Sequence, residues 1–285
     1  MGGLKLWGAA LLGTLALACG SSSDHPANLD GGLGNGGSGG GGGGSTSTGG
    51  TTSCDPKPGQ GVTLSGNLIV YDIFFKQDPP SAFTGQGIIL AEGAPCGVTQ
   101  TTYDGTAPGA DGGPNRFLLP SVQKGVSTWV RFYEDQSSNV GVYSTMLLVS
   151  TADDLVLDDA FGFINAADVQ KVYTDTNTTP LPDRGTIVVQ LIDGFSKLPA
   201  AGGKVATTAD AIAAYPQGAG WALDTGGTLS TDASGVMVLM NVESVPFPGS
   251  STAVNVTAGG ITDSHPLVVE TGTVTIARIV VGFQT

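Results

Sequence analysis

Three side chains on one short segment are suited to binding a ligand through an aromatic face. The segment VSTWVRFYED carries Trp129, Arg131 and Tyr133 at alternate positions. The residues between them, Val130 and Phe132, are apolar. Because side chains alternate across a β-strand, a strand that buries these apolar residues turns the other three toward solvent. Aromatic rings on an open sheet can stack on sugars, so this stripe is a candidate carbohydrate site. The alternative is packing against the segment between the folded units or against the neighbouring domain.

An acidic cluster is the second candidate site. It consists of Asp153, Asp154, Asp158 and Asp159. Calcium prefers several oxygen ligands gathered at one point, although the spacing here is not that of an EF-hand. A solvated acidic face is the other interpretation, and the sequence leaves calcium binding open.

Little in the chain suits enzyme chemistry or nucleic-acid binding. A hydrolytic zinc site generally combines histidine with carboxylate, and the only histidines are His25, in a glycine-rich segment, and His265, in an expected loop. The net charge is -13 and the basic residues are scattered, which argues against DNA or RNA as a partner. We expect no catalytic residues, no metal and no cofactor.

The start of the chain has the layout of an export signal, which we assign to residues 1–18. A lone Lys5 precedes the apolar run from Leu11 to Ala18, which is too short to span a bilayer comfortably. The cysteine that follows, Cys19, resembles the lipobox cysteine of bacterial lipoproteins. This resemblance implies a diacylglycerol on the Cys19 thiol, acyl chains such as palmitate, and attachment to a membrane of the cell envelope, with the outer membrane as the expected site. An ordinary signal peptide with an incidental cysteine is the alternative.

Residues 19–60 are expected to form a flexible tether, because a segment rich in Gly, Ser and Thr cannot bury a core. Two cysteines remain beyond Cys19, namely Cys54 at the end of the tether and Cys96 in the first folded unit. In an oxidising compartment they can pair, which would fasten the tether onto that unit. Two separate thiols are the alternative.

The rest of the chain has the composition of an all-β protein. Only 12% of the residues are charged, and apolar segments alternate with turn residues from Gly61 onward. We expect two tandem β-sandwiches, at residues 61–150 and 184–285. Residues 151–183 would connect them, with one helix in INAADVQKVYTDT that is capped by Asn165 and buries a stripe of Val169, Val172 and Tyr173. A plain linker is the alternative.

The second unit resembles the carboxypeptidase regulatory-like family, whose fold is a transthyretin-like, or more broadly immunoglobulin-like, β-sandwich. The matching positions are Gly185 and Asp193 around its first strand and Thr231, Asp232 and Gly235 at a hairpin. Asp232 can accept from backbone amides beyond it, and Gly235 can adopt a positive φ. The first unit shows the same order of features less cleanly. The resemblance implies no peptidase activity, because the zinc ligands of carboxypeptidases lie on a separate catalytic domain.

These observations predict a non-enzymatic, lipid-anchored protein of the cell envelope that acts as a structural or ligand-presenting module. A carbohydrate-binding surface lipoprotein that uses the aromatic stripe is the alternative. The expected partners are membrane lipid, through Cys19, and a glycan or an envelope protein. The ligand, the oligomeric state and the periplasmic or surface-exposed orientation stay open.

Overall fold

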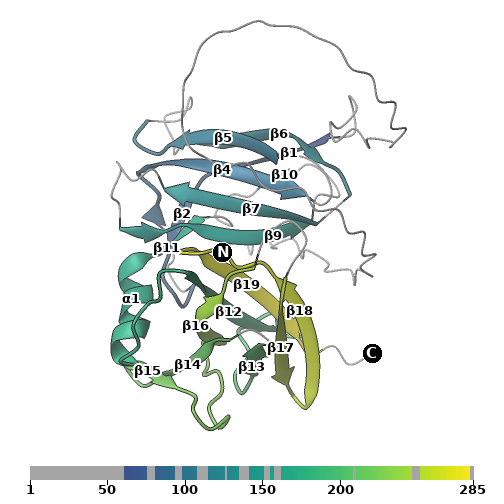
Figure 1. Ribbon diagram of the computed structural model, residues 1–285. Helices are drawn as coiled ribbons and strands as arrows, with labels where there is room; N and C mark the ends of the chain where they lie inside the picture. Colours follow the sequence, from purple (N-terminus) through teal and green to yellow (C-terminus); the bar gives the residue numbers. More distant parts are fainter. Residues whose placement is uncertain are drawn as a thin grey trace, which may run out of the picture. The chain divides into compact units, whose positions relative to one another are not determined.

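The described strands form four sheets, and the one described helix, α1 (Ala166–Asp175), lies at the side of the molecule beside β15 (Gly220–Leu223) and β16 (Val236–Glu243) (Figure 1). A computed structural model describes residues 61–75, 81–93, 98–107, 115–125, 127–134, 141–150, 155–156, 162–207, 210–245 and 251–282, which belong to one compact unit. The expected signal segment and tether, the three cysteines and the acidic cluster lie outside the described residues. Among the described residues, no helix is long and apolar enough to cross a membrane.

The first part of the chain contains eleven of the described strands. They are β1 (Gly61–Gly66), β2 (Ile69–Tyr71), β3 (Ser81–Ala82), β4 (Gln86–Gly93), β5 (Val98–Asp104), β6 (Phe117–Gln123), β7 (Ser127–Glu134), β8 (Val142–Tyr143), β9 (Thr145–Ser150), β10 (Leu155–Val156) and β11 (Gly162–Asn165).

One helix and eight strands follow among the described residues. They are α1 (Ala166–Asp175), β12 (Arg184–Asp193), β13 (Lys204–Thr207), β14 (Ile212–Gln217), β15 (Gly220–Leu223), β16 (Val236–Glu243), β17 (Thr252–Ala258), β18 (Ile261–Leu267) and β19 (Val274–Val281).

The first sandwich is built from two small sheets, β10-β1-β6 and β3-β2-β11-β8, together with strands β9-β7-β4-β5 of a nine-stranded sheet. Aromatic residues fill its core. Phe83 and Phe163 lie with ring centroids 4.2 Å apart, and Phe132 meets Phe163 edge-on at 6.2 Å. The all-β sandwich predicted from the sequence is confirmed.

Part of the expected connecting segment belongs to the first sandwich. β10 pairs with β1 in parallel, and β11 lies between β2 and β8. The helix that follows is confirmed at the predicted place. The Asn165 side chain accepts from the backbone N of Ala167 at 2.9 Å, and the helix buries Val169, Val172 and Tyr173. A capped helix therefore starts directly at the end of a strand.

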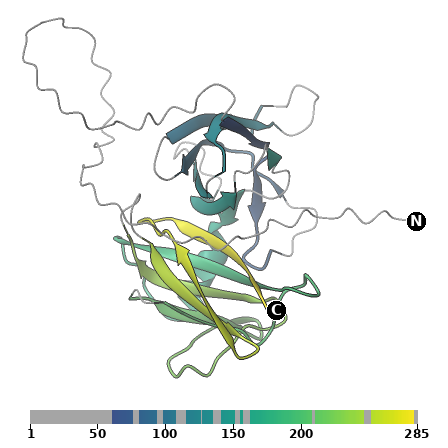
Figure 2. The same ribbon diagram turned by 90° about the vertical axis from the view of Figure 1, so that its right-hand side faces the viewer.

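The second sandwich packs strands β15-β14-β16-β12-β19 of the nine-stranded sheet against the three-stranded sheet β13-β17-β18. Figure 2 shows its strands, coloured green to yellow, in two layers. The central strand β12 is buried on both faces. Ile187, Val189 and Leu191 face the core between the two sheets, and Val188 belongs to a second cluster formed with α1 and β2.

The turn before β16 has the predicted hydrogen bond of Asp232 and the positive φ of Gly235, but it does not connect two paired strands. The Asp232 side chain accepts from the backbone N of Ser234 at 2.8 Å, and Gly235 has φ +68°. A Cβ on Gly235 would lie 2.5 Å from the carbonyl oxygen of Leu191, so the close approach of β12 also requires glycine. The expected hairpin is not formed, because β16 pairs with β12 and β14 and the preceding strand β15 pairs with β14.

The two sandwiches share the nine-stranded sheet through β9 and β19. These strands run parallel, with Val274 opposite Thr145 and Thr275 opposite Met146. The backbone N of Val274 donates to the carbonyl oxygen of Ser144 at 2.8 Å. The junction is therefore made by main-chain hydrogen bonds as well as side chains.

Gly162 provides a test of the first sandwich, because β11 passes very close to β2 there. A Cβ on Gly162 would lie 1.7 Å from the carbonyl oxygen of Ile69. We expect Gly162→Ala to lower the free energy of unfolding by about 3 kcal/mol, because a backbone must move to admit the methyl group. Gly226→Ala is the control, since its nearest neighbour would be Thr228 Cγ2 at 3.8 Å. Equal urea midpoints for the two variants would contradict this account.

Candidate functional site

In strand β7 (Ser127–Glu134) the side chains alternate between the two faces of the sheet, as the sequence predicts. Val130 and Phe132 are fully buried in the core of the first sandwich. Trp129, Arg131 and Tyr133 therefore lie on the opposite face.

That opposite face is covered and does not form the expected solvent-facing platform. Trp129 is only 7% exposed and belongs, with Met146 of β9, to the core cluster of the second sandwich. β7 pairs with β9, and β9 pairs with β19 of the second sandwich. This face of β7 therefore packs against the core of the second sandwich. The stripe therefore packs against the neighbouring domain, which was the alternative to a carbohydrate site.

Arg131 lies at the centre of a polar network at this junction. Its guanidinium is paired with Glu92 Oε2 of β4 at 3.0 Å and with Glu270 Oε1 at 2.8 Å. Tyr133 donates its hydroxyl to Glu270 Oε2 at 2.8 Å. Glu270 comes from the loop between β18 and β19, so the network links the two sandwiches directly. The side chain of Arg131 is only 12% exposed, which limits screening by solvent.

Burial alters the acid–base behaviour of this network. Burial raises the pKa of the Glu92 carboxyl above its ordinary value, against the opposing effect of the neighbouring guanidinium. Burial and the hydrogen bond to Glu270 raise the pKa of Tyr133 to about 12. Tyr133 therefore stays protonated and remains a hydrogen-bond donor at physiological pH.

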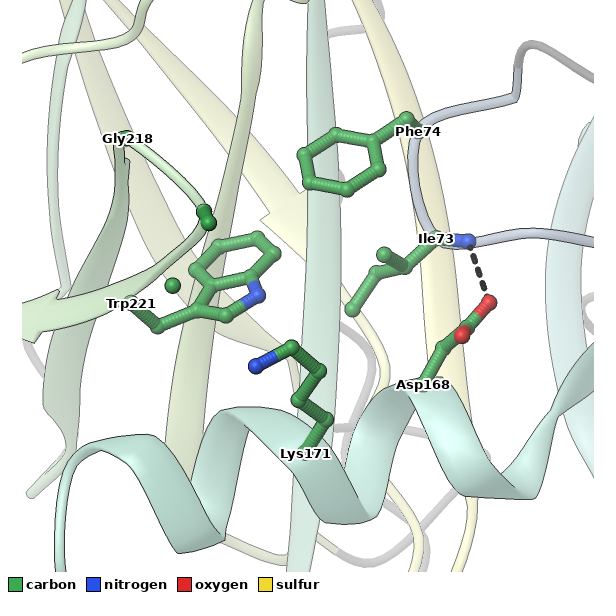
Figure 3. Close-up of a pocket in the computed structure, with 8 residues that line it drawn as sticks. Ile73, Phe74, Asp168, Lys171, Gly218 and Trp221 are labelled. Atoms are coloured by element: carbon green, nitrogen blue, oxygen red, sulfur yellow. Dashed lines mark hydrogen bonds between the residues drawn. The ribbon is translucent and has the colours of Figure 1, made fainter.

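A pocket elsewhere in the structure brings together residues that the sequence analysis did not single out. It is a cavity of about 190 Å³ lined by the loop after β2, by α1 and by the β14–β15 hairpin (Figure 3). The lining residues are Ile73, Phe74, Asp168, Lys171, Gly218, Ala219, Gly220 and Trp221.

One wall of this pocket is aromatic and the other is charged. The rings of Phe74 and Trp221 stack at a centroid distance of 5.6 Å and an interplanar angle of 15°. On the helix side, Asp168 Oδ2 accepts from the backbone N of Ile73 at 3.1 Å. Lys171 Nζ donates to Asp175 Oδ2 at 2.6 Å. In Figure 3 Lys171 points from α1 toward Trp221, whereas Asp168 points toward the backbone N of Ile73.

The loop after β2, which contributes Phe74 to the aromatic wall, is also fixed by contacts of its next residue, Phe75. Phe75 has φ +55°, an unfavourable region for a bulky side chain. Its ring packs edge-on against Tyr71 at 5.3 Å, and Arg278 of β19 lies 4.9 Å from its centroid. These contacts stabilise the strained turn and fix the position of Phe74.

The described residues do not gather a metal site. No group of three or more His, Cys, Asp or Glu side chains suited to a metal ion occurs among them. His265 lies within β18 rather than in the expected loop, opposite Val254. Burial lowers the pKa of its imidazole, against the influence of Asp263.

Comparison with known proteins gives no family for this chain. No protein-family profile matches it, and no curated protein matches it. The shaft pilin SpaA from Lactobacillus rhamnosus GG is 11% identical and covers 79% of this chain and 99% of its own, with a TM-score of 0.21. The tip fimbrial protein Mfa3 from Porphyromonas gingivalis is 10% identical over 72% of this chain and 81% of its own, also with a TM-score of 0.21. The group B streptococcus pilus 2b backbone protein is 12% identical over 69% and 78%, with a TM-score of 0.20. With TM-scores this low, function is argued from the residues of this chain alone.

The junction network predicts a pH-dependent effect of removing its cation. We expect Arg131→Met to lower the free energy of unfolding by about 2–4 kcal/mol at pH 7, because Glu92 and Glu270 then face each other without a counter-charge. The pKa of Glu92, already raised by burial, rises further in the variant. A folded state with the higher pKa binds protons more readily than the unfolded chain, so the stability of the variant increases as the pH falls.

The measurement is a series of urea midpoints for the wild type and the variant between pH 7 and pH 4. The gap between the two proteins should narrow as the pH decreases. Arg116→Met, at an exposed arginine of the first sandwich, is the control and should show no such trend. A gap that stays constant over this range would contradict the proposed role of the carboxylates.

Burial of Trp129 can be tested by fluorescence. The variant Trp221→Phe leaves Trp129 as the tryptophan of the described residues, with Trp7 in the expected signal segment. We expect blue-shifted emission and weak quenching by iodide in the native protein, and strong quenching after unfolding in urea. Equal quenching in the two states would restore the solvent-facing platform.

Proposed function

We propose that this chain is a non-enzymatic, lipid-anchored structural module of the cell envelope that presents a firmly joined pair of β-sandwiches. The observation that carries the proposal is the junction itself. Main-chain pairing of β9 with β19, the burial of Trp129 and the Arg131 network act on the same boundary. Three kinds of contact at one boundary favour a body whose two halves keep a constant relation, which suits a spacer or a presenting scaffold.

The proposed anchor rests on the first residues of the sequence. The apolar run that ends at Ala18 and the adjacent Cys19 support lipidation of the cysteine thiol and of the freed amine. Several acyl chains on one residue would make attachment effectively permanent. As a random coil, the tether would span roughly 30 Å, enough to hold the sandwiches clear of lipid head groups.

A disulfide between Cys54 and Cys96 is the second part of the proposal. It would fasten the end of the tether to the first sandwich, so that the membrane connection begins at the folded body. Closing a loop of this length could add roughly 4 kcal/mol of stability on the chain-entropy model. Mass spectrometry of the non-reduced, alkylated protein tests the bridge, and alkylation of both cysteines without prior reduction would rule it out.

Replacement of the proposed lipid-bearing residue tests the anchor. We expect Cys19→Ser to lose incorporation of a labelled fatty acid and to move from the membrane fraction to the soluble fraction, because no thiol remains for the diacylglycerol. Ser22→Ala, three residues away, is the matched control and should stay with the membrane. Unchanged fatty-acid labelling and membrane association of Cys19→Ser would overturn this part of the proposal.

A further inference from the structure

We propose that the pocket between Phe74, Trp221 and α1 binds one neutral sugar ring, as a free monosaccharide or as a single residue of a glycan. This inference goes beyond the structural role and does not depend on lipid attachment. It concerns a different place from the Trp129 stripe, which the second sandwich covers.

The size and the walls of the pocket set the shape of the ligand. A volume of about 190 Å³ is below the usual range of about 300–1,000 Å³ for drug-sized ligands, so it admits about one ring. Ile73, Phe74 and Trp221 give one apolar side, whereas Asp168 and Lys171 give a polar side. A sugar ring has the same division, with C–H groups on its face and hydroxyl groups along its edge.

The polar side requires a ligand that both donates and accepts hydrogen bonds. Asp168 and Lys171 are three residues apart on α1, a spacing that makes side chains neighbours on a helix. A carboxylate only accepts, and Asp168 has acceptor capacity beyond its contact with the backbone N of Ile73. An ammonium only donates, and Lys171 has donors beyond the one given to Asp175. Because Lys171 points toward Trp221 and Asp168 toward Ile73, two hydroxyl groups at different positions of one ring would bind the two side chains.

The charges around the pocket favour a neutral ligand over an ion. A cation that approached Asp168 would meet the ammonium of Lys171, and an anion that approached Lys171 would meet three carboxylates, those of Asp168, Asp175 and Asp72, the last of which acts on Asp168. Burial takes the Asp168 carboxyl partly out of water and raises its pKa above the ordinary value, and the charge of Asp72 acts in the same direction. A ligand hydroxyl that donates to this carboxylate would replace some of the lost hydrogen bonds without bringing a new charge.

The test is a binding titration of the full chain, purified in a detergent without a sugar head group. Glucose, galactose, mannose and N-acetylglucosamine are titrated by calorimetry and by tryptophan emission, to which Trp221 in the pocket contributes. Choline and acetate are the cationic and anionic probes. We expect at least one sugar to bind and to change the emission, and neither ion to displace it.

Three variants assign the binding to the pocket. Asp168→Asn retains an acceptor for the backbone N of Ile73, and Lys171→Met retains the length of the side chain. Each should weaken sugar binding tenfold or more, because a hydrogen bond to a charged group is lost. Lys204→Met, at an exposed lysine that donates to the carbonyl oxygen of Gly227, is the control and should bind as the wild type does.

Urea midpoints of all the variants separate loss of binding from loss of fold. Three results would overturn the inference: no sugar binds to folded wild-type protein at concentrations up to 50 mM; a sugar binds equally to wild type, Asp168→Asn and Lys171→Met; or choline or acetate binds in its place. Each result leaves the anchoring proposal untouched, because fatty-acid labelling at Cys19 is measured separately.

Discussion

The parallel pairing of β9 with β19 is the constraint on which the arrangement of the described residues depends. It extends over few residues, with Val274 opposite Thr145 and Thr275 opposite Met146, yet it places β7 beside the second sandwich. An edge strand exposes unpaired N–H and C=O groups, and joining two edges satisfies both. The same join brings Trp129 into the second core, while α1 and β2 cover the other face of the shared sheet. Strands β12 and β16 are thus buried on both faces.

Arg131 gives this junction specificity rather than a large gain in stability. Removing a guanidinium and two carboxylates from water is costly, so a buried ion pair often stabilises a fold no more than apolar packing would. The contribution of the Arg131 network is geometric, because it requires particular partners at particular positions. Arg131 must meet Glu92 on the neighbouring strand and Glu270 from the other sandwich, and Tyr133 binds the second oxygen of Glu270. A shifted register would leave buried charges without partners, so the network favours one alignment of the two halves.

Local patterns in the sequence predicted what local physics decides. Alternation assigned Val130 and Phe132 to a core, and Asn165 marked the start of α1, because both depend on nearby residues. Burial of the opposite face of β7 was not predictable in this way, since it depends on β19, a strand about 145 residues further along the chain. β11 is only four residues long and carries too little alternation to be recognised. The pocket was missed because its residues come from three separate elements, none of which has a distinctive motif.

The loop Asp72–Phe75 connects the junction with the pocket. The strained backbone of Phe75 persists because its ring packs against Tyr71 and Arg278, and the preceding side chain, Phe74, is thereby directed onto Trp221. The backbone N of Ile73 meets Asp168 of α1 in the same turn. The loop follows β2 of the first sandwich, whereas Trp221 and Arg278 belong to the second, so the pocket exists only while the two halves are joined. Any molecule that binds there must stabilise the joined state by mass action. Occupancy of the pocket therefore favours an intact junction, and loss of the junction would weaken binding in the pocket.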